Sequence, residues 1–391
     1  MKKINKFPRL STLSFYTFFE SEKTSGIFLI LCTIASLAIA NSILGHDYLS
    51  FWQLKLGPLS TEHWINDGLM AIFFLLIGLE LKRELISGEL SNFRHALLPI
   101  TAAIGGMVVP AAIHFGLNAG TATQSGIGIP MATDIAFALG ILALLGSRIP
   151  LSLKVFVVAF AVIDDLGAVI IIALFYTTKL SIAYLAGAAI LCSVLYALNK
   201  MKVMSLIPYL IGGAIMWVLM LKSGVHATIA GIALAFTIPY SHKNEDQKSP
   251  SYQLEHTLHK PVAFFILPIF ALANTGVTIS PTWIQDIMQS QNSLGIIYGL
   301  VLGKVIGVTL FSLVAIRIGI CQLPDRLSWH HLLGAGLLGG IGFTMSIFIT
   351  NLAFIGNAEI INASKMAILL ASFVAGALGF IWLRFMTPVK K

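Results

Sequence analysis

Four ionisable residues of this sequence fall inside apolar stretches, namely Asp134, Asp164, Asp165 and Lys304. At the centre of a membrane helix a charged side chain costs roughly 2.5–3.5 kcal/mol on insertion scales, so ionisable groups there mark ion or proton sites by default. Carboxylates suit this chemistry because they bind a hard cation through oxygen or accept a proton. The four residues therefore predict a buried site that either a cation or protons can neutralise.

The two adjacent aspartates lie near the middle of the stretch VFVVAFAVIDDLGAVIIIALFY. Neighbouring residues of a helix point about 100° apart, so Asp164 and Asp165 are predicted to make different contacts. One carboxylate would face a cation cavity and the other a helix partner. Lys304, in GLVLGKVIGVTLF, is the natural partner because its own position is costly unless it is paired. The structural alternative is an aspartate pair that Lys304 and helix ends satisfy for packing alone.

The composition shows which kind of chain must position these residues. Of the 391 residues, 57% are hydrophobic and 11% charged, whereas soluble domains carry about 25% charged residues. This argues against a soluble enzyme and excludes a disordered chain, and three distant cysteines exclude a disulfide scaffold. Twelve apolar stretches with short links predict an all-α polytopic membrane protein with twelve transmembrane helices, in a single domain over residues 1–391.

The stretch GIGIPMATDIAFALG predicts a helix that is interrupted at membrane depth. Pro130 removes a backbone donor and disfavours helix at the preceding residue, and Gly126 and Gly128 weaken the same turn. Unwound backbone at that depth is tolerated only inside protein or beside a water cavity. Thr133 and Asp134 lie next to the break and are candidates for cation or proton binding, with a kink that has no function as the alternative.

A similar segment recurs near the C-terminus, where residues 340–346 match residues 126–132 at four of seven positions. Both segments lie in the second span of a three-span group, spans 3–5 and spans 10–12, and the two groups enter the membrane from opposite sides. This predicts inverted repeats with discontinuous helices 4 and 11, which is where transporters of this kind place a binding site. The helix of Lys304 also carries glycines whose four-residue spacing lets another helix approach closely: Gly299, Gly303 and Gly307.

The distribution of basic residues predicts the orientation of the chain. Of 25 Lys and Arg residues, 20 fall in the two termini and the loops after even-numbered spans, and four fall in loops after odd-numbered spans. The positive-inside rule then makes both termini cytoplasmic, together with the charged link over residues 240–260. The cytoplasmic residues 1–23 are predicted to contain a helix over 7–22 at the membrane surface. Because the net charge of +8 follows this topology, no nucleic-acid partner is expected.

Motifs over nearly the whole chain resemble the NhaA family of sodium/proton antiporters: FFLLIGLELKREL, IPMATDIAFALGILALLGSR, AVIDDLGAVIIIALFY, LKSGVHATIAG, LEHTLH, GLVLGK and GIGFTMSIFI. The resemblance implies a twelve-span protein of the bacterial inner membrane, with discontinuous helices 4 and 11 that cross; this family is itself an example behind the rule on interrupted spans. It also implies exchange of internal sodium or lithium for external protons, activated at alkaline pH and without a cofactor. Asp164 and Asp165 match the family's essential aspartates, Thr133 and Asp134 its polar residues at the break, and Lys304 the lysine that pairs with the first aspartate.

The resemblance further implies a pH-response cluster at the cytoplasmic ends of spans 2 and 9, for which charged groups that simply face water are the alternative. The residues at the matching positions are Glu80, Arg83, Glu84, Glu255, His256 and His259. His226 begins span 8 on the outer side, and a regulatory role and a satisfied interfacial histidine are both open for it. Dimers of the family can be joined by an outer hairpin between spans 1 and 2, which the short link over residues 46–60 could form.

Two other functions are alternatives to sodium/proton exchange. An intramembrane aspartyl protease needs carboxylates on facing helices, whereas Asp164 and Asp165 are consecutive and no Gly-x-Gly-Asp segment occurs in the sequence. A sodium-coupled solute symporter needs solute-binding groups beyond the carboxylates and leaves Lys304 unexplained. In an antiporter the coupled carboxylates bind either ion, and two protons displaced per sodium would make the exchange electrogenic.

Overall fold

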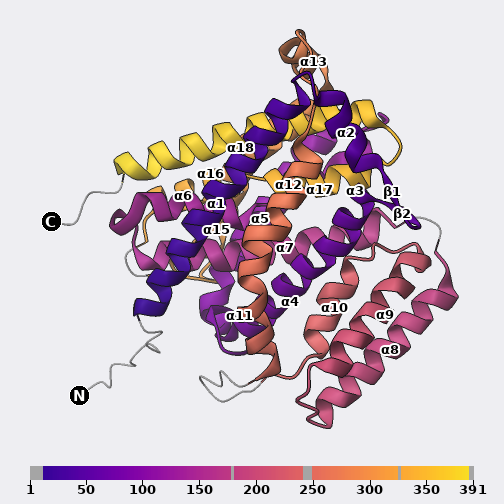
Figure 1. Ribbon diagram of the computed structural model, residues 1–391. Helices are drawn as coiled ribbons and strands as arrows, with labels where there is room; N and C mark the ends of the chain where they lie inside the picture. Colours follow the sequence, from indigo (N-terminus) through magenta and orange to yellow (C-terminus); the bar gives the residue numbers. More distant parts are fainter. Residues whose placement is uncertain (1–11, 178–179, 241–248, 325–326, 387–391) are drawn as a thin grey trace, which may run out of the picture.

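Helices dominate the computed structural model, which describes residues 12–177, 180–240, 249–324 and 327–386 (Figure 1). Within these ranges, eight helices are long and apolar enough to cross a bilayer, or nine if the bent pair α16 (Trp329–Gly339) and α17 (Phe343–Ala353) forms one span. The predicted all-helical polytopic class is confirmed at this level. The number of twelve spans stays a prediction.

The N-terminal part begins with one continuous helix, α1. Residues 12–22 of the predicted surface helix therefore run into the first span without a boundary. Residues 7–11 of that prediction lie outside the described ranges. Residues 46–60 form helix α2 and then a short hairpin, in which Lys55 pairs with Ser60. Gly57 in the turn has a φ of 70°, which glycine adopts without a steric cost. The elements are α1 (Thr12–Ala40), α2 (Gly45–Gln53), β1 (Lys55–Leu56), β2 (Leu59–Ser60), α3 (Thr61–His63), η1 (Trp64–Leu69), α4 (Met70–Ile86), η2 (Glu89–Ser91) and α5 (Phe93–Asn118).

The middle part differs from the prediction at the link over residues 240–260, because helix α11 already begins at Pro250. The Ser249 side chain caps this helix by accepting a hydrogen bond from the backbone of Tyr252, and proline is well tolerated in a first turn because it lacks only an orphan N–H. Residues 241–248 of the link lie outside the described ranges. The elements are η3 (Gln124–Met131), α6 (Ile135–Leu145), η4 (Gly146–Arg148), α7 (Leu151–Phe175), α8 (Ile182–Lys200), α9 (Ile207–Ser223), α10 (Ile229–Thr237), α11 (Pro250–Pro261), η5 (Val262–Ile266) and α12 (Leu267–Thr275).

The C-terminal part brings its helices against those of the middle part, and the long α18 lies across the top of the view in Figure 1. A π-helical turn, η6, directly precedes Lys304, which begins α15. Such turns are rare within helices and occur often at functional sites. The elements are α13 (Trp283–Gln289), α14 (Gln291–Tyr298), η6 (Gly299–Gly303), α15 (Lys304–Arg317), α16, α17 and α18 (Ala358–Met386).

Helices α5 and α15 touch through their backbones. A Cβ atom added to Gly307 would lie 2.0 Å from the carbonyl oxygen of Gly105, and one added to Gly105 would lie 2.2 Å from that of Gly307. A Cβ atom on Gly299 would lie 2.6 Å from the ring of Pro130, beside the interrupted helix. The predicted close approach along the glycine stripe is therefore confirmed, and it brings Lys304 against the break after η3.

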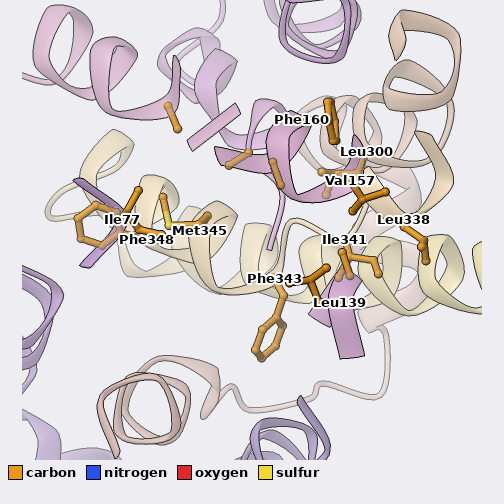
Figure 2. Packing of buried hydrophobic residues seen from close by; sticks show 14 of the residues in the cluster. Ile77, Leu139, Val157, Phe160, Leu300, Leu338, Ile341, Phe343, Met345 and Phe348 are labelled. Carbon is orange, nitrogen blue, oxygen red and sulfur yellow. The ribbon is translucent and has the colours of Figure 1, made fainter. Parts of the chain in front are cut away.

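The main apolar core surrounds this crossing and is built from helices that are distant in sequence. Figure 2 shows Ile77 of α4, Phe160 of α7, Leu300 of η6 and Phe343 and Phe348 of α17 among its buried side chains. In a bilayer, where lipid is as apolar as leucine, close van der Waals packing holds such helices together. The core therefore fixes the two breaks relative to each other.

Lys82, near the end of α4, forms hydrogen bonds with the C-terminal end of α10. Its ammonium group donates hydrogen bonds to the carbonyl oxygens of Ala235 and Phe236, each at 3.2 Å, and to that of Ile238. Carbonyls at the end of a helix have no intrahelical partner, and a positive charge is favourable there. A basic residue that the sequence assigned only to topology therefore also caps a helix.

We expect Gly307→Ala to destabilise the protein by about 1–3 kcal/mol, because the added methyl group would meet backbone that cannot yield. Thermal unfolding in detergent would measure the loss. The matched control is Gly116→Ala in α5, where nothing lies within 4 Å of an added Cβ atom and alanine favours the helix. Equal melting of the two variants would contradict a tight contact between α5 and α15.

Candidate functional site

Two interrupted helices meet at the centre of the molecule. Three residues separate η3 from α6, and three separate α16 from α17. The Asp134 backbone N–H donates to the carbonyl oxygen of Ile341 at 2.6 Å, and the Thr133 hydroxyl donates to that of Gly339 at 2.8 Å. Unwound backbone away from water must find partners inside the protein, and here carbonyl oxygens at the second break accept both hydrogen bonds from the first.

The Asp134 carboxylate lies at the start of two helices. Its Oδ1 accepts a hydrogen bond from the Phe137 N–H of α6 at 3.1 Å, and its Oδ2 accepts from the Thr344 N–H of α17 at 3.1 Å. The Thr344 hydroxyl also donates to Oδ2. Because helix N-termini carry partial positive charge, one buried carboxylate offsets two of them. Its oxygens are thus engaged by the protein itself.

Lys304 holds the opposite charge beside the same break. Its Nζ lies 2.7 Å from Oδ2 of Asp164, and both side chains are fully buried. The ammonium group also donates to the Thr133 hydroxyl at 3.0 Å and to the carbonyl oxygen of Met131, the last residue of η3. Lys304 therefore neutralises Asp164 and at the same time compensates the negative end of η3.

Asp165 differs from its neighbour, as the helical geometry predicts. It is 1% exposed, and its Oδ1 has no hydrogen-bond partner among the described residues; Oδ1 of Asp164 has none either. A buried carboxylate that keeps its charge without a partner costs far more free energy than one that is neutralised. Of the two aspartates, Asp164 has an ion pair with Lys304, whereas Asp165 has an unpartnered Oδ1 and no such ion pair among the described residues.

A cavity of about 80 Å³ reaches this carboxylate, and we call it the Asp165 cavity. It has room for a few water molecules, each of which takes about 30 Å³ in the liquid. Its polar lining runs from the C-terminal half of α4 to the two breaks and consists of Glu80, Arg83, Asp134, Asp165, His259 and Thr344. The remaining lining is apolar, so the cavity offers an ion few oxygen atoms other than those of the carboxylates.

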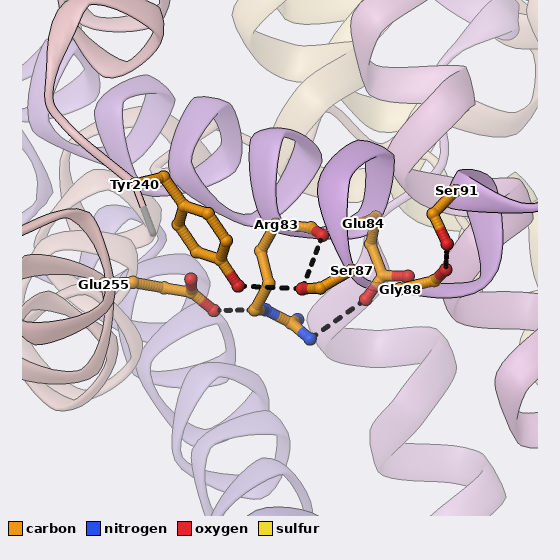
Figure 3. Close-up of polar contacts among 7 residues, drawn as sticks. All are labelled: Arg83, Glu84, Ser87, Gly88, Ser91, Tyr240 and Glu255. Atoms are coloured by element: carbon orange, nitrogen blue, oxygen red, sulfur yellow. Dashed lines mark hydrogen bonds and ion pairs between the residues drawn. The ribbon is translucent and has the colours of Figure 1, made fainter. Parts of the chain in front are cut away.

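Arg83 at the end of α4 joins this helix to α11, as Figure 3 shows. Its Nε donates to Oε1 of Glu255 at 2.8 Å, and its Nη1 lies 3.0 Å from Oε1 of Glu84. Nearby, the hydroxyl groups of Ser87 and Tyr240 lie 2.7 Å apart and join α4 to the segment after α10. The structure therefore brings together three of the six residues expected at the ends of spans 2 and 9.

The other three residues of that set are divided. Glu80 and His259 line the Asp165 cavity together with Arg83. His256 is exposed and stacks on Tyr252, with 6.3 Å between the ring centroids, so it lies apart from the cavity lining. A role of His256 in the same cluster has no contact to support it in the described part of the chain.

His226 lies in the turn between α9 and α10 and outside the Asp165 cavity. Its Nε2 donates to the carbonyl oxygen of Tyr176 at 2.9 Å, and the Tyr176 hydroxyl donates to that of Ser125 at 2.7 Å. Burial lowers the pKa of the His226 imidazole, while the hydrogen bond to Tyr176 opposes this shift. The histidine is therefore linked through Tyr176 to the start of η3.

Two contacts at this site were missed by sequence reasoning. Thr344 was inside the segment that aligns with the first break, and its place at the start of the second half-helix was the available signal. Tyr176 had none, because an aromatic residue at the end of a span is common at a membrane interface. Thr344 meets Asp134 because the two breaks cross, whereas the Tyr176 hydroxyl contacts backbone groups of η3.

This chain is similar to known proteins over nearly its whole length. The family described as Na+/H+ antiporter 1 matches residues 16–383. The "Na(+)/H(+) antiporter NhaA" of Dechloromonas aromatica is 66% identical over 95% of this chain and 96% of that protein. The "Na(+)/H(+) antiporter NhaA 1" of Flavobacterium johnsoniae is 57% identical over 97% of this chain and 99% of that protein. The "Na(+)/H(+) antiporter NhaA" of Cytophaga hutchinsonii is 57% identical over 95% of each chain.

These similarities cover the interrupted helices, the aspartate pair and Lys304 together. They agree with the resemblance that the motifs indicated and with a buried site suited to ions rather than to catalysis. The chain belongs to the Na+/H+ antiporter 1 family, which is a family of membrane transporters and not of enzymes.

Proposed function

We propose that this protein exchanges sodium, or lithium, for protons at Asp164 and Asp165. The observation that carries the proposal is the difference between the two carboxylates: Asp164 is neutralised by Lys304, whereas Asp165 is buried without a hydrogen bond to Oδ1 and faces a cavity. Such a site must bind a proton or a cation to remain buried. Competition between these two ligands for the same oxygens is the basis of antiport.

The ion pair supplies a second proton to this cycle. In the cation-free site one proton resides on the Lys304 amine and another neutralises Asp165. When sodium binds between the carboxylates, both of these protons are released. One sodium charge then exchanges for two proton charges, so the exchange is electrogenic. The bare carboxylate pair is too costly to carry across a dry barrier, which prevents leak without a bound ion.

Asp134 and Thr133 take part by keeping the crossing in place. The Asp134 oxygens accept hydrogen bonds from α6 and α17, and the Thr133 hydroxyl lies within 3.0 Å of Lys304. Asp134 then compensates helix ends, and Thr133 lies close enough to the pair to add an oxygen ligand to a cation. Both residues also remain candidates for the path of the ion.

We infer an orientation and topology for this site. Twelve spans, with η3–α6 as the fourth and α16–α17 as the eleventh, account for the two breaks and for 20 basic residues in one set of loops. The termini then lie in the cytoplasm, the Asp165 cavity opens inward, and the β1–β2 hairpin lies outside. The protein is placed in the bacterial inner membrane, with the hairpin as the contact of a homodimer.

Competing functions fit the geometry less well. An aspartyl protease needs two carboxylates that share a water, but Asp164 is bound to Lys304 and Asp134 to two helix N-termini. A solute symporter would leave the buried ion pair between Lys304 and Asp164 unexplained. Ion exchange therefore remains the function that the site supports best.

We expect Asp165→Asn to abolish exchange, because an amide neither accepts a proton near neutral pH nor binds sodium as a carboxylate does. Uptake of radioactive sodium into proteoliposomes, driven by an imposed pH gradient, would fall to the level of liposomes without protein. The control is Asp47→Asn, an exposed aspartate of α2, which should retain full uptake. Full uptake by Asp165→Asn would refute the proposed site, and a requirement for an added solute would favour a symporter.

Lys304→Met should destabilise the protein by about 3–5 kcal/mol, because it leaves the Asp164 carboxylate buried without its partner. The loss should be larger at alkaline than at acid pH, since protonation removes the unpaired charge. The double variant with Asp164→Asn should recover most of the stability in thermal unfolding while sodium uptake stays absent. If the double variant and Lys304→Met melted at the same temperature, the loss of stability in Lys304→Met would not come from the unpaired charge of Asp164.

We also infer that the ion pairs of Arg83 help to set the pH at which exchange begins. In Arg83→Gln the carboxylate of Glu255 loses a cation that favours its ionised form. Activation of exchange should therefore shift towards alkaline pH in fluorescence assays of everted vesicles. The control is Lys260→Gln, which changes an exposed basic residue of α11. If Arg83→Gln and Lys260→Gln have the same pH profile of exchange, the ion pairs of Arg83 do not set the pH of activation.

A further inference from the structure

A second cavity lies beyond the Asp165 cavity along the same helices. It has a volume of about 690 Å³, and we call it the hairpin-side cavity because residues of α2 and of the segment after the hairpin line it. Its polar lining includes Glu62, Asn66, His226, Asn351 and Lys365. No lining residue is shared with the Asp165 cavity, so a barrier separates the two.

Three helical segments cross this barrier. On η1–α4, Asn66 lines the hairpin-side cavity and Phe73 the Asp165 cavity. On α17, Asn351 lines the former and Met345 the latter, and the continuous helix of η5 and α12 likewise contacts both cavities. The barrier therefore lies where α4, α12 and α17 pack together.

Asn66 and Asn351 line the hairpin-side cavity, and both are hydrogen-bonded to Asn274 beneath them; we call these three amide side chains the amide cluster. Asn274 of α12 is fully buried; its Nδ2 donates to Oδ1 of Asn66 at 2.8 Å, and its Oδ1 accepts from Nδ2 of Asn351 at 2.6 Å. Its Nδ2 also donates to the Phe270 carbonyl oxygen at 3.0 Å, which fixes the amide on α12. The contact between Asn351 and Asn274 is the hydrogen bond that joins α17 to α12.

Aromatic rings add an apolar contact in the same barrier. Phe348 of α17 lies 5.6 Å from Phe74 of α4 and 6.4 Å from Phe270 of α12 between ring centroids, and all three side chains are buried. Phe348 is one turn from Asn351 on the same helix. Asn274 of α12 is thus joined to α17 through Asn351 and to η1 through Asn66, next to the ring contacts that Phe348 makes with α4 and α12.

We propose that the hydrogen bond from Asn351 to Asn274 is a latch that keeps the route to the hairpin-side cavity closed while the Asp165 cavity is open. This inference deepens the proposed exchange, in which the site must open to each side in turn. Because α17 carries Thr344 at the ion site, movement of the site away from α12 must break this latch. The broken latch leaves polar amides, rather than apolar surface, along the opened route.

The test measures access to the barrier and not transport. In a background with Cys32→Ala, Cys192→Ala and Cys321→Ala, a reporter Ile77→Cys lies in the Asp165 cavity. A membrane-impermeant maleimide is added to the hairpin side of oriented vesicles. A net hydrogen bond contributes about 0.5–1.5 kcal/mol, so Asn351→Ala or Asn274→Ala should speed labelling of the reporter about two- to thirteenfold.

Three controls make the outcome decisive. Asn362→Ala changes another amide of the same cavity outside the amide cluster and should leave the rate unchanged. The exposed reporter Ile355→Cys shows that the reagent reaches the hairpin-side cavity, so a wrong orientation is detected separately. Ala188→Cys, buried among α8–α10, reports unfolding. Unchanged labelling in Asn351→Ala and Asn274→Ala, or equal acceleration by Asn362→Ala, would overturn the latch. Because labelling needs no sodium or proton movement, this result does not depend on whether exchange itself is observed.

Discussion

The structure depends on the need to satisfy backbone groups where two helices are interrupted away from water. The crossing of the breaks meets part of this need directly, since the Asp134 N–H and the Thr133 hydroxyl of the first break donate to carbonyl oxygens at the second. The remaining helix ends require charge, and Asp134 and Lys304 provide it with opposite signs. The arrangement of helices around the site is therefore inseparable from the presence of charged residues at its centre.

Lys304 connects this structural requirement to the chemistry of ions. The same ammonium group contacts the end of η3 and the carboxylate of Asp164, so its protonation and position respond to whatever occupies the aspartate pair. The carboxylate one position later faces a different direction, and its Oδ1 has no hydrogen-bond partner among the described residues. The different surroundings of the two neighbouring aspartates follow from the angle between adjacent helical residues.

Much of this arrangement could be predicted because charges in apolar stretches are conspicuous. Asp164, Asp165 and Lys304 were identified as a group from their cost, and Pro130 marked the first break. The sequence could not show that Lys82 caps α10 or that Asn351 meets Asn274, because such contacts depend on side-chain directions across distant helices. The boundary at α11 was misplaced for a different reason: its first turns are polar, and periodicity in apolar residues could not reveal them.

The contact between Gly105 and Gly307 has a mechanical consequence. Two helix backbones that touch without intervening side chains cannot approach further, and a slide along either axis would bring larger neighbours into collision. Helices α5 and α15 therefore behave as one stiff unit. Any displacement large enough to expose the ion to the opposite side must take place at the borders of this unit, where side chains with several rotamers can exchange partners.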